Sequence, residues 1–208
     1  MKRENNHPRQ SHDSSPSPDP HPDRAIRPRG NYRDLLSFQK AEVVFDLTFR
    51  FAHKYLPRGD RTRDQMIQAA RSGKKNILEG SKDAVVSKKI ELSLTGTARG
   101  SLEELLDDYL DFLRVRDLRI WDKDSPEALY VRKLGRKVPL SFEDFREFFD
   151  TRPPEVTANI AICLIHQANY LLDRQIERLD KDFVQEGGFS ERLYRVRTRH
   201  RKGYPPRG

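Results

Sequence analysis

Residues 32–56 read YRDLLSFQKAEVVFDLTFRFAHKYL, and this stretch decides the fold class. Its apolar side chains recur at steps of three and four residues, which is the repeat of one face of an α-helix. The members of that face are Leu35, Phe38, Val43 or Phe45, Leu47, Phe49 or Phe51, and Ala52. Pro57 and Gly59 end the pattern, so we predict a helix over about 34–56.

The helical repeat continues beyond this stretch. We predict further helices over about 60–82, 87–116 and 154–185. Asp60 or Thr62 can cap the first of these and Ser87 the second, while Gly187 and Gly188 end the last. No segment alternates apolar and polar residues as a strand would. The sequence therefore predicts an all-α domain, an up-and-down antiparallel four-helix bundle.

Residues 117–153 form an insertion between the third and fourth long helices. A short helix over 125–134 fits its first half. The second half holds aromatic residues at helical spacing, so we predict a helical insertion. Its aromatic side chains are either additional core or an interface: Trp121, Phe142, Phe145, Phe148 and Phe149.

The charge of the chain is unevenly distributed. The 208 residues contain 40 Lys and Arg against 32 Asp and Glu, a formal charge of +8. Residues 1–30 carry a net +2 and 189–208 a net +6, which leaves 31–188 neutral. The Pro-rich segment 1–30 has the composition of a disordered tail. We predict three parts: that N-terminal tail, the helical domain 31–188, and a basic C-terminal tail over 189–208.

Several classes of protein do not fit this composition. The longest apolar run, 160–165, is far shorter than the roughly 20 residues that cross a bilayer, and no apolar signal segment follows the N-terminus. Cys163 is the only cysteine, and His7, His12 and His21 match no metal-ligand spacing. We expect a cytoplasmic protein without membrane contact, metal or other cofactor.

The second predicted helix has an unusual polar seam. Heptad steps along it select small and polar side chains where a bundle normally buries Leu or Ile: Gln65, Ala69, Ser72, Asn76 and Glu79. Gly96 and Gly100 lie in the middle of the third helix, where each costs about 1 kcal/mol. We expect these glycines to approach the second helix closely, at Ala69, Ser72 or Gly73. Arg99 would then pair with the buried Glu79 and, one turn along, with Glu103.

The seam has too few acid and base side chains for an active site. Ser72, Asn76, Glu79 and Arg99 could line a small site, but no second carboxylate, His or Cys stands at a matching spacing to share acid and base roles. Cys163 lies in the most apolar run of the chain, where cysteine is usually an inert hydrophobe. We predict a polar network that fixes helix register, and no catalytic activity.

Nucleic acid is the partner that the charge favours. The predicted phosphate contacts of the C-terminal tail are Arg192, Arg195, Arg197, Arg199, Arg201 and Lys202, with Tyr194 and Tyr204 placed to stack on bases. Lys74 and Lys75 add charge on the second helix, although its basic side would equally suit a neighbouring subunit's acidic third helix. The alternative function is a ring-forming protein-interaction module without nucleic acid.

Three stretches of the chain resemble a known family. They are YRDLLSFQKAEVVFDLTFRFAHKYL, DQMIQAARSGKKNILEGS and LTGTARGSLEELLDDYLDFL. Together they resemble the bacterial four-helix-bundle proteins encoded by intervening sequences of large-subunit ribosomal RNA genes, in a long subfamily with a C-terminal extension. That family is similar to the accessory variability protein of diversity-generating retroelements. The resemblance implies a homopentameric ring, no known catalysis, and RNA or DNA and a reverse transcriptase as partners.

Overall fold

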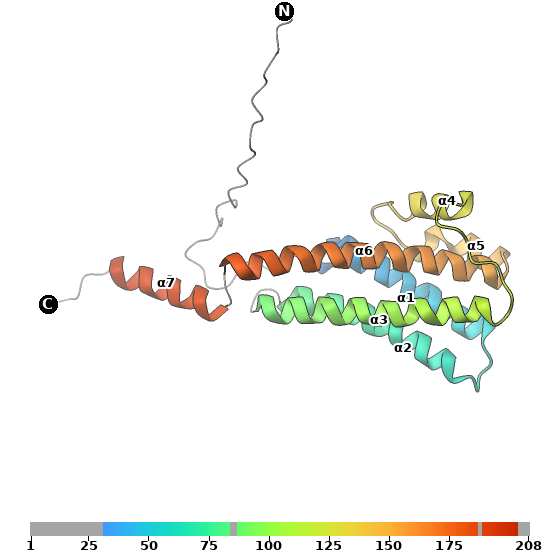
Figure 1. The fold of residues 1–208 in the computed structure, drawn as a ribbon, viewed down its shortest axis with the longest axis horizontal. Helices are drawn as coiled ribbons and strands as arrows, with labels where there is room; N and C mark the ends of the chain where they lie inside the picture. The colour runs from blue at the N-terminus through green and yellow to red at the C-terminus, as the bar shows by residue number, and fades with distance from the viewer. Residues whose placement is uncertain (1–30, 84–86, 187–188, 204–208) are drawn as a thin grey trace, which may run out of the picture.

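The structure is a computed structural model that describes residues 31–83, 87–186 and 189–203 (Figure 1). Within these ranges all regular elements are helices, which confirms the all-α prediction. They are η1 (Tyr32–Asp34), α1 (Leu36–Tyr55), α2 (Arg61–Asp83), α3 (Lys88–Arg114), α4 (Pro126–Leu134), η2 (Phe142–Asp144), α5 (Arg146–Thr151), α6 (Pro154–Glu186) and α7 (Phe189–Gly203). The prediction for 1–30 lies outside the described residues.

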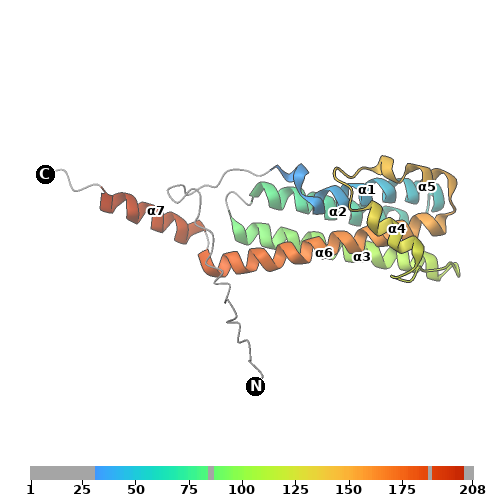
Figure 2. The ribbon, with the colours of Figure 1, turned by 90° about the horizontal axis from the view of Figure 1, so that it is seen from above.

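Four long helices make up the body of the molecule. α2 packs against α1 and α3, and α6 packs against the other sides of α1 and α3. α4 and α5 lie at one end of this body, and α7 extends beyond the other end (Figures 1 and 2). None of the helices in the described ranges is long and apolar enough to cross a membrane.

Local sequence explains where several helices begin. Asp60 Oδ1 accepts a hydrogen bond from the Thr62 backbone N–H at 2.9 Å, just before α2. Ser87 Oγ accepts from the Ile90 N–H at 3.4 Å at the start of α3, as the sequence predicts for this cap. Each contact satisfies one of the N–H groups that a helix leaves unpaired in its first turn.

Aromatic side chains pack together at the centre of the core between α1 and α3. The Phe51 ring lies 5.1 Å from the Tyr109 ring and 4.8 Å from the Phe112 ring, centroid to centroid. Tyr109 is fully buried, and its hydroxyl donates to Thr48 Oγ1 at 3.0 Å. This contact satisfies a polar group that would be costly to bury unpaired.

The insertion extends this core. α4 matches the helix predicted over 125–134, and η2 and α5 carry the aromatic residues that follow. Phe142, Phe145 and Phe149 are buried against the long helices, and Trp121 and Phe148 are partly buried beside them. Of the two roles that the sequence left open for these side chains, the structure places them in the core.

The buried face of α2 differs from the prediction by one residue. The buried residues are Met66, Ala69, Ala70, Gly73, Ile77 and Gly80. Gln65 and Glu79 are exposed, and Ser72 and Asn76 are only partly buried. Of the predicted seam, Ala69 is buried, and the other four residues lie along the edge of α2 rather than on its core-facing side.

The glycine contacts of α3 also differ from the prediction. Gly96 and Gly100 are exposed, and a Cβ on either would meet no atom within 4 Å. The close approach instead involves α2 glycines. A Cβ on Gly73 would lie 2.8 Å from Leu102 Cδ2, and one on Gly80 would lie 3.3 Å from Leu94 Cβ. The prediction of a tight α2–α3 contact was therefore wrong for Gly96 and Gly100, whereas Gly73, one of the α2 residues that it named as a partner, does lie at a close contact.

Candidate nucleic-acid interface

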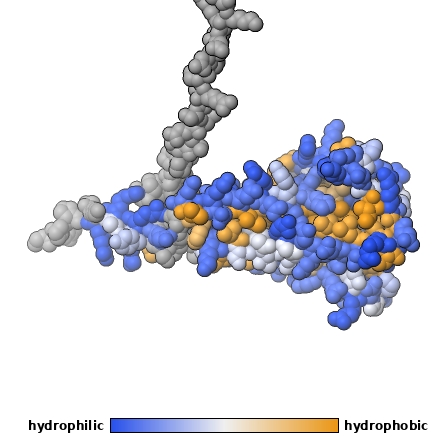
Figure 3. All heavy atoms as spheres, in the orientation of Figure 1, coloured by the Kyte–Doolittle hydropathy of each residue, from blue (hydrophilic) through white to orange (hydrophobic). Residues whose placement is uncertain are grey.

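The basic segment after residue 188 is helical over its described part. α7 carries Arg195, Arg197, Arg199 and Arg201, all of which are exposed. The side chains of Arg192 and Lys202, and all of Tyr204, lie outside the described residues. The surface over α7 is largely hydrophilic (Figure 3), so this helix presents charge to solvent along its length.

Helical geometry divides these arginines between two faces. At about 3.6 residues per turn, Tyr194, Arg197 and Arg201 fall on one side of α7, and Arg195 and Arg199 on the other. Tyr194 is 71% exposed. The guanidinium groups of Arg197 and Arg201 make no ion pair or hydrogen bond with a described residue, whereas Arg195 and Arg199 already take part in interactions within the chain. The Tyr194–Arg197–Arg201 face is therefore the one with uncommitted charge.

The two predicted lysines of α2 lie elsewhere. Lys74 is partly buried, and its Nζ stands 4.2 Å from the centre of the Phe45 ring on α1. Lys75 is exposed. α7 extends away from the four long helices (Figure 2), so the structure does not gather the α2 and α7 cations into one patch.

The predicted polar network is divided into two by α3. On the α2 side, Asn76 Nδ2 donates to Ser72 Oγ at 3.2 Å, and Ser101 Oγ donates to the same oxygen at 3.0 Å. These short side chains bridge the two helices without any charged member. Gln65 lies outside this cluster, exposed on the wall of the adjoining groove.

The charged half of the network joins α3 to α6 instead. Arg99 Nε donates to Asp173 at 2.8 Å, and Arg99 Nη1 donates to Glu103 at 3.1 Å. Asn169 Nδ2 donates to the same Glu103 oxygen at 3.0 Å. The predicted Arg99–Glu103 pair is thus present. The predicted Arg99–Glu79 pair is wrong, because Arg99 faces α6 while Glu79 is exposed on α2.

The groove between α2 and α3 is acidic. It has a volume of about 670 Å³, and Glu104 and Asp108 line its α3 side. Partial burial, and then the negative charges of Asp111, Glu104 and Asp107, raise the pKa of Asp108 to about 6. Asp64 and Arg61 also line the groove, and its excess of carboxylates would repel phosphate.

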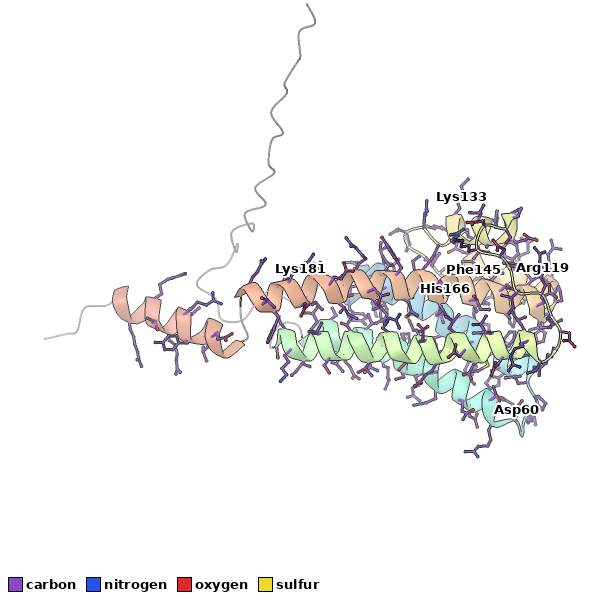
Figure 4. All side chains as sticks on the ribbon, in the orientation of Figure 1. Asp60, Arg119, Lys133, Phe145, His166 and Lys181 are labelled. Atoms are coloured by element: carbon purple, nitrogen blue, oxygen red, sulfur yellow. The ribbon has the colours of Figure 1, made fainter. Side chains whose placement is uncertain are left out.

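The structure also describes the side chains that the sequence offered for catalysis or metal binding. Burial raises the pKa of the Cys163 thiol to about 11, so little thiolate is present near neutral pH. Within the described ranges, no group of three or more His, Cys, Asp or Glu side chains is arranged to hold a metal ion. His166 is exposed on α6 (Figure 4) rather than packed against a thiolate.

One buried cation was missed by the sequence reasoning. Lys40 occupies a core-facing position of α1 and is only 8% exposed. A lysine at helical spacing from Ser37, Ala41 and Val44 was the available signal, because that face is otherwise apolar or small. Its partners lie far along the chain and gave no local pattern.

Comparisons with known proteins add no relative. A scan against models of protein families found no match. Searches of curated proteins and of solved structures found no match either.

Proposed function

We propose that this chain is a non-enzymatic, oligomeric scaffold that associates with RNA or DNA through α7. The observation that carries the proposal is the exposed face of Tyr194, Arg197 and Arg201. Two arginines without partners in the described chain are available for phosphate contacts, and each contact releases counterions from the nucleic acid. The exposed Tyr194 ring on the same face suits stacking on an unpaired base.

The helical geometry of α7 indicates which of its faces contacts the nucleic acid. Arg197 and Arg201 are one turn apart, about 6 Å along the axis, which is close to the spacing of successive phosphates in a single strand. Arg195 and Arg199 point to the opposite side and are already engaged. We therefore assign the primary contact to one face of α7, with the exposed Lys75 as a secondary contact.

Oligomerisation is the second part of the proposal. We infer that α1, α2, α3 and α6 form an up-and-down antiparallel four-helix bundle with a helical insertion, in keeping with the order in which they contact one another. We further propose that the chain belongs to the intervening-sequence family that its sequence resembles, and that it forms a homopentamer in the cytoplasm. Five copies of α7 would act together, so weak contacts by each would sum to high avidity. A reverse transcriptase is a further partner under this proposal.

Gly96 and Gly100 form an exposed strip on α3, and this strip favours the assembly of several copies of the chain. Gly96 and Gly100 have open space above them, although each costs about 1 kcal/mol of helix stability relative to alanine. Closely packed helices of a second copy would offset that cost. This observation also favours the second candidate function, a ring-forming protein-interaction module in which nucleic acid has no role.

The salt dependence of binding tests the leading proposal. Fluorescence anisotropy with a single-stranded RNA or DNA oligonucleotide is measured over a series of salt concentrations. The logarithm of the binding constant falls linearly with the logarithm of salt concentration, and the double variant Arg197→Gln/Arg201→Gln should make this slope less steep. The expected change is about 1.4 per chain, from about 0.7 for each lost phosphate contact. A matched control, Arg58→Gln/Arg152→Gln, removes the same charge from exposed positions of the body and should leave the slope nearly unchanged.

The outcomes separate the two functions. Absence of binding by the unsubstituted chain to any single- or double-stranded RNA or DNA at low salt refutes the nucleic-acid role. If sedimentation still shows a closed oligomer, the interaction-module alternative remains. Equal slopes for the two double variants would refute the assignment to the α7 face.

A further inference from the structure

A cavity of about 550 Å³ lies between the start of α1, the segment after α4 and the middle of α6. This volume is in the range of small-molecule sites, which are mainly apolar with a few polar groups. Leu36 and Tyr170 supply apolar surface and are 44% and 64% exposed. The charged residues that line the cavity are all basic, with no Asp or Glu among them.

Lys40 is a buried cation among the residues that line the cavity. Its Nζ donates to the Gly135 carbonyl oxygen and, at 3.1 Å, to Gln167 Oε1. Both acceptors are neutral, and Lys40 makes no ion pair with a described residue. Burial, reinforced by the nearby Arg136, lowers the pKa of this ammonium group. A buried cation without a counter-ion is costly, and an anion would relieve that cost.

The surrounding backbone holds Lys40 in place. Gln167 Nε2 donates to the Arg132 carbonyl at 2.9 Å, which orients the amide oxygen toward Lys40. A Cβ on Gly135 would overlap the Gln167 amide and lie 3.2 Å from Leu164 Cδ2. Glycine at this position thus allows the lysine, the carbonyl and the amide to meet. An ammonium group has three donors, so one remains for a ligand.

The rim of the cavity adds further positive charge. Arg136 is exposed, and its guanidinium group makes no ion pair or hydrogen bond with a described residue. By contrast, Lys137 pairs with Asp144, and Arg132 lies 3.7 Å from Asp124. Lys40 and Arg136 are therefore the two cations here without a compensating carboxylate.

We propose that this cavity binds a small organic anion, in which a carboxylate or phosphate group is attached to an apolar body. The anionic group would lie between Lys40 and Arg136, and the apolar body would cover Leu36 and Tyr170. The cavity is separate from the α7 face, so this proposal does not depend on nucleic-acid binding.

Calorimetric titration of the full chain tests the ligand class. Octanoate supplies a carboxylate, phenyl phosphate a phosphate, and octanol a neutral apolar body, all in a buffer free of both anions. We expect at least one of the two anions to bind at least tenfold more tightly than octanol, and the preferred anion identifies the head group. Failure of both anions to bind, or equal affinity for octanol, would overturn the proposal.

Three variants locate the site. Lys40→Met and Arg136→Gln should each weaken binding of the preferred anion at least fivefold. Lys133→Gln removes an exposed cation from α4 outside the cavity (Figure 4) and should leave affinity unchanged. Circular dichroism checks folding, and Arg136→Gln decides the matter if Lys40→Met does not fold. Equal affinities for the Arg136 and Lys133 variants would contradict the proposed site.

Discussion

The packing of α2 against α3 can be tested by the same substitution at two glycines. In Gly73→Ala, the new Cβ would lie 2.8 Å from Leu102 Cδ2 and 2.9 Å from Leu102 Cγ. Leu102 is fully buried, so it has little room to move. In Gly96→Ala, the new Cβ meets no atom within 4 Å. The two variants share their chemistry and differ only in what surrounds the added methyl group.

The expected free energies have opposite signs. Replacing a helical glycine by alanine gains about 1 kcal/mol at either position. Overpacking against Leu102 costs about 2 kcal/mol, within the range for an added methyl group in a filled core. Gly73→Ala should therefore lower the free energy of unfolding by about 1 kcal/mol, and Gly96→Ala should raise it by about 1 kcal/mol.

Urea denaturation followed by circular dichroism measures this difference. For a urea m-value of about 2 kcal/mol/M, the two midpoints should differ by about 1 M. Gly100→Ala serves as a second open position. Because the proposed oligomer would pack a second copy over Gly96 and Gly100, the comparison is made at a protein concentration at which size-exclusion chromatography shows every variant to be monomeric. A lower midpoint for Gly96→Ala than for Gly73→Ala would refute the outward orientation of this α3 face.

Three further predictions concern individual side chains. The pKa of Asp108 rises from 3.8 to about 6 on folding, so its carboxylate reduces stability as the pH rises through that interval. Asp108→Asn should therefore increase the free energy of unfolding at pH 7.5 by about 1 kcal/mol after solvent screening, with little effect at pH 4, as measured by urea denaturation. Cys163 should react with a disulfide reagent at pH 8 about tenfold more slowly than a thiol of unshifted pKa, because its thiolate is about 100-fold scarcer but more nucleophilic, and urea should abolish the difference. Thr48→Val should destabilise the protein by about 2 kcal/mol in thermal or urea unfolding because it leaves the Tyr109 hydroxyl buried without its partner, whereas Thr48→Ser should be milder.

Helix positions were predictable because their causes are local. Ser87 caps α3 as expected, and α6 begins at Pro154, where the sequence places a proline in the first turn. The buried face of α2 was less predictable. Its core side includes Gly73, Ala70 and Gly80, which contrast only weakly with the small residues on the neighbouring face. The contact partner on α3 decides which face is buried.

The contacts of charged residues were predicted least well. Arg99 pairs with Asp173, which lies 74 residues away in the sequence, and no periodic pattern within one helix reveals such a partner. Lys40 likewise depends on Gly135 and Gln167. For α7, the predicted concentration of arginine is present, but its division into two faces depends on helix formation that composition alone did not indicate.

A mobility-shift experiment on the full chain and on a chain ending at residue 188 tests the proposed function most directly. With single-stranded RNA and DNA at low salt, the full chain should shift the oligonucleotide, and the shortened chain should lose most of that binding because it lacks α7. Sedimentation should show the same oligomeric state for both. Undiminished binding by the shortened chain would contradict the central role of α7, and no shift with either chain would contradict nucleic-acid association itself.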